Sequence, residues 1–119
     1  MGELQPFEVY EAIGAELEHE AVSPEQTVAG APETGVAELG ALGGVSYGIW
    51  EMTAGAMRDI EADEVFVVLE GTGEVELLQG GATVSRISLR PRSIVRLAAG
   101  MSTVWTVPER LRKFYIAIG

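Results

Sequence analysis

Residues 55–71 read GAMRDIEADEVFVVLEG, and this stretch decides the fold. It contains a continuous apolar run, Val65 to Leu69, which is rich in β-branched and aromatic residues and is closed by a glycine. Such a run is typical of a buried strand. Three carboxylates, those of Glu61, Asp63 and Glu64, stand directly before it. A strand that opens on a crowded acidic cluster is therefore the first expectation.

Similar short apolar runs continue on both sides of this stretch, from Val45 to the end of the chain. They are separated by glycine or proline at short intervals, which indicates a sandwich or barrel. No convincing helical periodicity interrupts them, so an antiparallel all-β domain is favoured over a βαβ fold. The expected strands are 45–54, 56–60, 64–70, 73–79, 82–89, 93–97, 102–107 and 111–118.

Glycine and proline also predict how these strands connect. We expect a hairpin at Gly71-Thr72-Gly73 and a two-residue turn at Gly80-Gly81. Arg90-Pro91-Arg92 predicts a wider corner. Short connections of this kind suit an antiparallel sheet.

The first 44 residues differ from the rest of the chain. Residues 1–57 carry ten acidic side chains and no lysine or arginine, and residues 21–44 are rich in Gly, Ala and Pro. We expect one structural domain, in which an acidic N-terminal arm (1–44) packs on a β-barrel (45–119). A short helix or strand is possible in residues 1–20, and at most one short strand is expected in residues 21–44. Two arrangements of the arm stay open: a solvated arm, or an arm that lies over the arginine-bearing second half.

Composition excludes several classes of function. The chain has 119 residues, enough for one domain, and contains no cysteine, which rules out disulfides, zinc-cysteine sites and thiol nucleophiles. A net charge of −10 argues against a nucleic-acid partner. No apolar run is long enough to span a membrane, and the acidic start lacks the features of a secretory signal. We therefore expect a cytoplasmic protein without a membrane partner.

The spacing within residues 55–71 resembles the first metal-binding motif of the cupin superfamily of small jelly-roll barrels. Five residues follow Gly55, and Glu61 and Asp63 then stand at the positions of the two motif histidines. Glu64 stands at the position of the motif glutamate. Residues 90–107 are similar to the second cupin motif, and the position of its metal histidine falls near Thr103. The resemblance therefore implies the cupin fold, although none of the three metal-binding positions of the motifs carries a histidine.

One subgroup is matched more fully: small single-domain RmlC-like cupins related to ethanolamine-utilisation cupins and to ureidoglycine aminohydrolase. The resemblance covers roughly residues 23–118 and rests on the order of several short motifs. These are Gly30-Ala31-Pro32, Gly48-Ile49-Trp50-Glu51, Glu64, Leu69-Glu70-Gly71, Trp105 and Arg112-Lys113. It implies an all-β cupin (RmlC-like) antiparallel jelly-roll β-barrel with an extended N-terminal arm. It also implies a homodimer, because related small cupins tend to dimerise.

We predict a ligand-binding cavity inside this barrel, lined by Trp50, Glu64, Arg96, Trp105 and Tyr115. The two tryptophans would form an aromatic wall, although such residues also commonly fill a core or an interface. Arg96 would hold an anion if it points inward, and would be an ordinary solubilising charge if it points outward. Lys113 and Tyr115 share one face of the last strand, but strand parity does not reveal which face is inside.

Glu64 is the best candidate for a catalytic residue. At the start of an apolar strand it could project into the barrel as a general acid or base whose pKa is raised by burial. The alternative is an ion pair with a basic residue such as Arg58 or Arg96. His19 is the only histidine, and without a neighbouring serine, cysteine or second histidine it is interpreted as a surface residue.

The carboxylates of Glu61, Asp63 and Glu64 are weak candidates for a metal site. Oxygen ligands suit magnesium, manganese or calcium, but the imidazole ligands typical of catalytic transition metals are missing. We expect this acidic loop to be solvated. No cofactor is therefore predicted, and a divalent metal is the disfavoured alternative.

These observations favour a small-molecule-binding cupin of unassigned ligand that works without a histidine-ligated metal. Fold alone does not assign an activity, so whether the protein is an enzyme stays open. The first alternative is a hydrolase, isomerase or lyase on a small polar metabolite, in which Glu64 and a cation converge from different strands. The second is a non-catalytic dimerisation or scaffold cupin, which predicts an apolar interface and no pocket.

Overall fold

The computed structural model describes residues 2–118 and consists of strands and turns, with no helix among these residues. It follows that the described part of the chain contains no helix capable of crossing a membrane. The strands are β1 (Glu20–Ala21), β2 (Thr27–Gly30), β3 (Glu33–Leu42), β4 (Val45–Ile60), β5 (Glu64–Gly71), β6 (Gly73–Gln79), β7 (Ala82–Leu89), β8 (Ile94–Leu97) and β9 (Ser102–Ile118).

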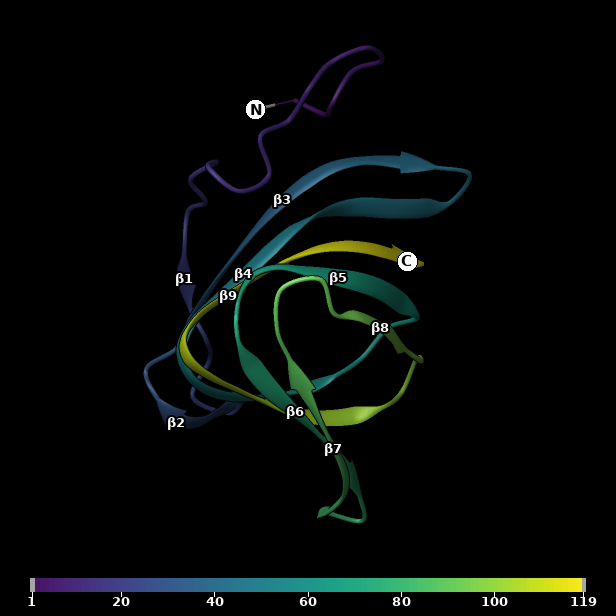
Figure 1. Ribbon diagram of the computed structural model, residues 1–119. Helices are drawn as coiled ribbons and strands as arrows, with labels where there is room; N and C mark the ends of the chain where they lie inside the picture. The colour runs from purple at the N-terminus through teal and green to yellow at the C-terminus, as the bar shows by residue number, and fades with distance from the viewer. Residues whose placement is uncertain (1, 119) are drawn as a thin grey trace.

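All strand pairs are antiparallel and form one strongly curled sheet (Figure 1). The main path runs β1-β3-β4-β9-β5-β8, while β2 pairs with β4, β6 pairs with β9, and β7 pairs with β6. The sheet curls around a core without closing into a complete barrel. The predicted all-β, jelly-roll-like fold is confirmed.

The two longest strands, β4 and β9, each replace a pair of strands that we expected to be separate. They pair with each other along their whole length, and a register shift between Thr53 and Gly55 bends β4 at the predicted break. Gly55 has φ 143°, and a Cβ there would lie 2.8 Å from Pro32, so this bend requires glycine. The glycine therefore bends the strand instead of ending it, because pairing with β9 continues on both sides.

The prediction of a hairpin at Gly71-Thr72-Gly73 is wrong. β5 and β6 do not pair with each other; both pair with β9, β5 near its C-terminal end and β6 near its N-terminal end. The Gly71 turn (φ 85°) carries the chain from one half of β9 to the other. Gly71 does form a turn, as its sequence predicts. The pairing of both β5 and β6 with the distant β9 determines where the chain runs after that turn.

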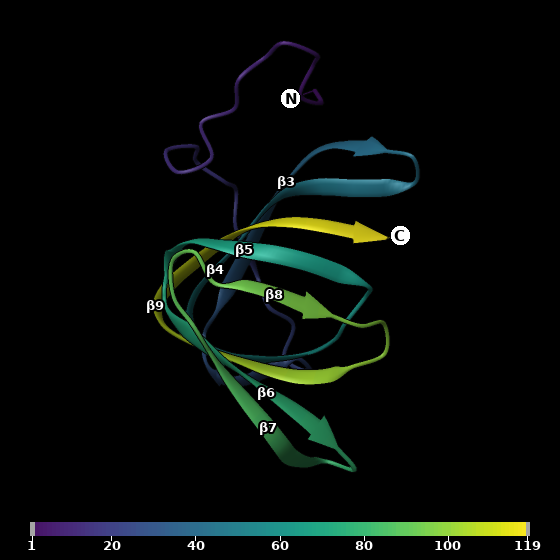
Figure 2. The ribbon, with the colours of Figure 1, turned by 45° about the vertical axis from the view of Figure 1, so that its right-hand side comes forward.

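The other two predicted connections occur as expected. Gln79 pairs with Ala82, which confirms the two-residue turn at Gly80-Gly81. Residues 90–92 form the corner between β7 and β8, where Ser93 donates its backbone N–H to the carbonyl of Arg90 (2.9 Å). The hairpin of β6 and β7 extends away from the rest of the sheet (Figure 2).

The N-terminal region is more ordered than expected. Beyond the short β1, two strands, β2 and β3, lie within residues 21–44, where at most one was expected. β3 pairs with β4 from Thr34 to Leu42, so it covers an edge of β4 that would otherwise expose unpaired backbone groups. Composition misled here because glycine and alanine are poor strand formers, and the pairing partner outweighs that preference.

The segment before β1 crosses the outer face of β3, β4 and β9. The buried Arg112 donates from Nη1 to the carbonyls of Ala12 (2.7 Å) and Ile13 (3.2 Å). Arg112 Nε also donates to Glu51 (2.9 Å), whose other oxygen lies 2.6 Å from His19 Nε2. The arm thus lies against the arginine-bearing half of its own chain, and His19, although at the surface, is tied to a buried carboxylate.

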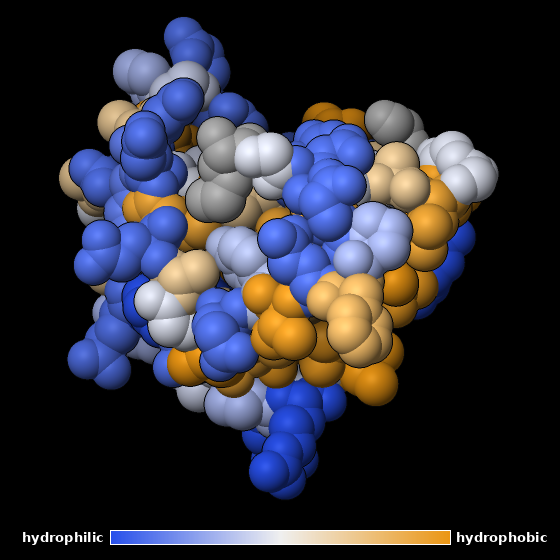
Figure 3. Space-filling view, turned by 90° about the horizontal axis from the view of Figure 1, so that it is seen from above, coloured by the Kyte–Doolittle hydropathy of each residue, from blue (hydrophilic) through white to orange (hydrophobic). Residues whose placement is uncertain are grey.

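Alternation along β9 separates the inner and outer faces of the sheet. Lys113 and Tyr115 point inward, together with the core around Phe66 and Trp105. Ile116 and Ile118 point outward and are exposed. Further exposed apolar side chains lie beside them, because Val65 pairs with Ile116, and Val45, the partner of Ile118, also pairs with Leu42. Orange, apolar residues gather on one side of the space-filling view, opposite the hydrophilic side (Figure 3).

Candidate functional site

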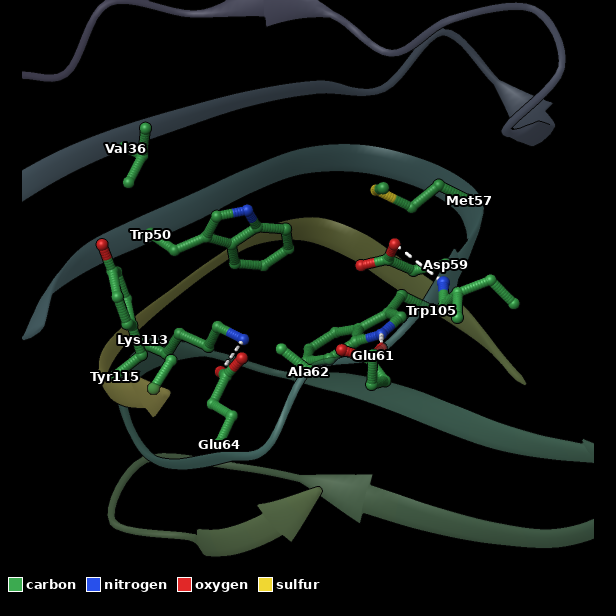
Figure 4. Close-up of a pocket in the computed structure, with 12 residues that line it drawn as sticks. Val36, Trp50, Met57, Asp59, Glu61, Ala62, Glu64, Trp105, Lys113 and Tyr115 are labelled. Atoms are coloured by element: carbon green, nitrogen blue, oxygen red, sulfur yellow. Dashed lines mark hydrogen bonds and ion pairs between the residues drawn. The ribbon is translucent and has the colours of Figure 1, made fainter. Parts of the chain in front are cut away.

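A cavity of about 280 Å³ opens between the inner faces of β4, β5 and β9, and we call it the central cavity. It is lined by Val36, Trp50, Met57, Asp59, Ile60, Glu61, Ala62, Glu64, Trp105, Lys113, Tyr115 and Ala117 (Figure 4). Its volume lies just below the usual range for small-molecule pockets, roughly 300–1,000 Å³. The lining combines aromatic walls with four charged side chains.

An ion pair forms part of the wall of the central cavity. Lys113 Nζ on β9 lies 2.6 Å from Glu64 Oε2 at the start of β5, and both side chains are largely buried (6% and 12% exposed). The same ammonium lies over three rings, 4.8 Å from the centroid of Trp50, 4.3 Å from Phe66 and 4.7 Å from Trp105. The Lys113 side chain is therefore held by one ion pair and by three cation–π contacts.

A second carboxylate, that of Glu61, is held by neutral donors. Thr103 Oγ1 (2.6 Å) and Trp105 Nε1 (3.0 Å) both donate to Glu61 Oε2. All three side chains are buried. This network fixes the plane of the Trp105 indole, which packs 5.4 Å from Trp50 and 5.6 Å from Phe66 between ring centroids. Glu61 thereby helps to build the aromatic wall.

Asp59 and Tyr115 both have pKa values above their ordinary ones. Burial raises the pKa of Asp59, and the neighbouring charge of Glu61 raises it further. Burial, and then the charges of Glu38 and Glu64, raise the pKa of Tyr115. The cavity thus disfavours additional negative charge.

The structure brings together four of the five side chains expected to line a cavity: Trp50, Glu64, Trp105 and Tyr115. Arg96 is placed elsewhere. It lies on the outer face of β8, is 57% exposed, and pairs with Asp63 (3.1 Å). Arg96 neighbours Val65 in the sheet, and Val65 faces outward, so the parity of β8 directs Arg96 to solvent.

Asp59 and Lys113 were absent from the expected lining. Asp59 lies in β4, two residues before Glu61, which directly follows the strand, and a period of two continued by one residue would have placed both on one face. Lys113 shares one face of β9 with Tyr115, so the expectation that Tyr115 lines the cavity implies the same position for Lys113. Glu64 pairs with Lys113, not with Arg58 or Arg96. Both β8 and β9 are neighbours of β5, but Lys113 faces the cavity as Glu64 does, whereas Arg96 faces outward.

The family of the chain follows from comparison with known proteins. The family model described as the EutQ-like cupin domain matches residues 39–115, which is more than half of the chain. The chain belongs to the EutQ-like cupin domain family. This confirms the resemblance to cupins of ethanolamine utilisation. No curated protein sequence gives a significant match to this EutQ-like cupin.

Solved structures show the same fold at low sequence identity. The EutQ protein of Clostridium difficile is 19% identical, with a TM-score of 0.62 over 73% of this chain and 68% of that one. A putative ethanolamine utilization protein Q from Salmonella typhimurium is 13% identical, with a TM-score of 0.58 over 87% and 98%. A Pseudomonas syringae protein of unknown function is 21% identical, with a TM-score of 0.71 over 87% of this chain but 44% of its own.

The side chains at the cupin metal positions of this EutQ-like cupin do not form a metal site. Glu61 and Thr103 do meet, but Thr103 donates a hydrogen bond to Glu61. Asp63 points away and accepts hydrogen bonds from Arg96 and from the backbone N–H of Ala99 (3.1 Å each). Glu64 is held by Lys113. Across residues 2–118 no three His, Cys, Asp or Glu side chains are grouped so that they could hold a metal ion. The donor set therefore does not fit the metal that the fold usually carries.

Proposed function

We propose that this EutQ-like cupin binds a small molecule in the central cavity, and that it does so without a histidine-ligated metal or another cofactor. The observation that carries the proposal is the cavity itself, where two tryptophans, a tyrosine and the Glu64–Lys113 pair converge from β4, β5 and β9. Binding sites of this kind combine apolar walls with a few fixed polar groups. The hydrogen-bonded Trp105 supplies a rigid wall, which lowers the entropic cost of binding.

The proposal is tested on the purified, untagged protein. Native mass spectrometry should detect a bound small molecule, and a metabolite library should include compounds that raise the melting temperature by binding. Trp50→Ala should remove both effects, whereas Val84→Ala on the exposed β7 should leave them unchanged. A library without a single binder, together with no bound molecule, would refute the proposal. Stoichiometric manganese, iron, nickel or zinc in elemental analysis would refute its metal-free part.

An enzymatic role is the second candidate, and one contact favours it. Glu64 and Lys113 meet from different strands inside a cavity, as a hydrolase, isomerase or lyase with Glu64 as acid or base would require. In such an enzyme Lys113 would position the Glu64 carboxyl group and hold an anionic group of the intermediate. Glu64→Gln should then abolish turnover while ligand binding persists. Turnover that survives this substitution would exclude the role.

A homodimer is the partner that the outer surface supports. The exposed apolar side chains beside Ile116 and Ile118 form a sheet face without a cover among residues 2–118. Apolar patches of this kind commonly mark protein interfaces. A dimer is compatible with either function, because the central cavity opens on the inner face of the sheet. A cytoplasmic location also stays a prediction, which fractionation of the producing cells would test.

A further inference from the structure

The charges that line the central cavity are unequal. Three carboxylates, those of Asp59, Glu61 and Glu64, face one ammonium group, that of Lys113, so the fully ionised lining carries a net charge of −2. Lys113 is committed to Glu64 at 2.6 Å. Among the described residues, neither Asp59 nor Glu61 has a cationic partner within salt-bridge distance. The cavity therefore has uncompensated negative charge.

The aromatic walls already hold one cation. Lys113 Nζ lies within 5 Å of the centroids of Trp50, Phe66 and Trp105. The electron-rich faces of such rings attract ammonium groups, most strongly where water is excluded. Trp50 and Trp105 also line the open volume of the cavity, next to Asp59 and Glu61 (Figure 4). Trp50 and Trp105 thus contribute both to the cation–π contacts of Lys113 and to the lining of the open volume.

A neighbouring groove extends the acidic field. Between the arm and β3 lies a groove of about 670 Å³ that shares Val36 and Trp50 with the central cavity. The described residues that line it include the glutamates Glu16, Glu18, Glu20 and Glu38 and no lysine or arginine. Clefts lined by one sign of charge raise the local concentration of the opposite charge. An approaching cation would be attracted along this side of the molecule.

We propose that the central cavity selects a small organic ammonium ion, held against the wall that Trp50 and Trp105 line and by the carboxylates of Asp59 and Glu61. The inference rests on the proposed function and adds the chemical class of the ligand. An anionic ligand would meet three carboxylates and would compete with Glu64 for Lys113. A neutral ligand would leave Asp59 and Glu61 without a cationic partner, although Glu61 keeps its two hydrogen bonds.

Matched probes isolate the charge. Choline, its neutral isostere 3,3-dimethylbutan-1-ol, and the anion 3,3-dimethylbutanoate share a branched apolar head and differ in charge. Isothermal titration and quenching of tryptophan fluorescence measure their affinities for the full chain. Choline should bind about tenfold or more tightly than the neutral isostere, as desolvated cation–π and ionic contacts together provide. Added salt should weaken choline binding and leave the isostere unaffected.

Two variants connect the selectivity to the cavity. Asp59→Asn should weaken choline binding about fivefold or more and leave binding of the neutral isostere unchanged. Asp63→Asn removes an exposed carboxylate of the neighbouring loop, which pairs with Arg96 outside the cavity, and should change neither affinity. Choline binding should also weaken as the pH falls into the raised titration range of Asp59, which Glu61, Glu64 and Lys113 surround.

Each other outcome counts against the inference. Equal affinity for choline and its isostere, or tighter binding of the anion, would overturn the selection for cations and leave a small-molecule site in place. Choline binding that is unaffected by Asp59→Asn would place the cation outside the central cavity. If none of the three probes binds and no molecule co-purifies with the protein, both the inference and the proposed function fail.

Discussion

Lys113 is a charged residue at the centre of the aromatic core. Its ammonium is surrounded by three aromatic rings and by Glu64, and no polar atom of this buried group lacks a partner. Ionised groups are tolerated at such a position only when they are paired. The pair therefore sets the charge balance of the cavity as well as its shape.

Removal of one member of this pair should destabilise the fold. Lys113→Met leaves Glu64 buried without its partner, and we expect a loss of about 3 kcal/mol in the free energy of unfolding. The double variant Lys113→Met/Glu64→Gln should recover much of that loss, because the buried charge is then gone. Urea denaturation followed by tryptophan fluorescence measures both variants. A single variant as stable as the wild type would contradict the buried pair.

Glu51 is a second residue at which charge controls stability. Burial by itself would raise the pKa of Glu51, but hydrogen bonds from His19 and Arg112, with the charges of Arg112 and Arg110, hold it below its ordinary value of 4.5. A carboxyl whose pKa is lowered by folding stabilises the folded state above its unfolded pKa. That contribution is lost as the pH falls through the lowered value.

The acid limb of the stability curve should therefore change in Glu51→Gln. The wild type should lose stability progressively below pH 4.5, whereas the variant, already less stable at neutral pH, should show a shallower decline there. Asp59 has the opposite effect on stability. Its pKa is raised in the folded state, so protonation of Asp59 as the pH falls favours the folded state. Melting temperatures of the wild type, Glu51→Gln and Asp59→Asn, measured between pH 3 and pH 7, test both effects. Parallel curves for wild type and Glu51→Gln would count against the effect of Glu51.

Among the elements, the arm before β1 is held by close approach as well as by charge. Gly35 on β3 lies directly under it, and a Cβ at this position would stand 2.7 Å from the carbonyl oxygen of Glu18 and 2.9 Å from the His19 ring. The backbone of the arm fits only because position 35 has no side chain. The contact is independent of the hydrogen bonds to Arg112.

Gly35→Ala should lift the arm without removing any polar group. We expect a loss of about 1–3 kcal/mol in stability, the usual cost of overpacking, and faster amide hydrogen exchange in residues 12–19. Gly14→Ala is the matched control, because a Cβ there has no atom within 4 Å. Hydrogen exchange read by mass spectrometry compares the two. Equal exchange in both variants would mean that the arm is not seated on Gly35.

At the scale of the whole molecule, the two faces of the sheet serve different purposes. The inner face carries the core and the central cavity, while the outer face is divided between the arm with its ionic network and an exposed apolar area around Ile116. The division follows the length of β4 and β9, since the arm covers their middle and leaves the ends near Val45 and Ile118 uncovered.

This apolar area should be the dimer interface. Ile116→Asp should convert a dimer into a monomer, because a buried unpaired carboxylate at an interface costs several kcal/mol. Val84→Asp, at an exposed apolar position of the β6–β7 hairpin, should leave the oligomeric state unchanged. Sedimentation velocity over a range of protein concentrations measures both. A wild-type protein that remains monomeric at all concentrations would refute the proposed dimer.

The sequence by itself determined the fold class and most strand positions, because β-branched runs between glycines encode strands locally. It also identified Trp50, Glu64, Trp105 and Tyr115 as residues that would share a cavity. The alternation of side chains along a strand shows which residues share a face. It does not show which of the two faces meets the core. Arg96 was misplaced for that reason.

Only the tertiary structure determined which side chains and which strands contact one another. Glu64 meets Lys113 across 49 positions of sequence, and Arg112 reaches the arm across 100. The turn at Gly71 became a link between the halves of β9 because both neighbouring strands pair with that one strand. Pairing of this kind depends on which edges are left free when the sheet assembles, and no local pattern records it. The charge of the central cavity, and with it the class of ligand that we propose, follows from those pairings.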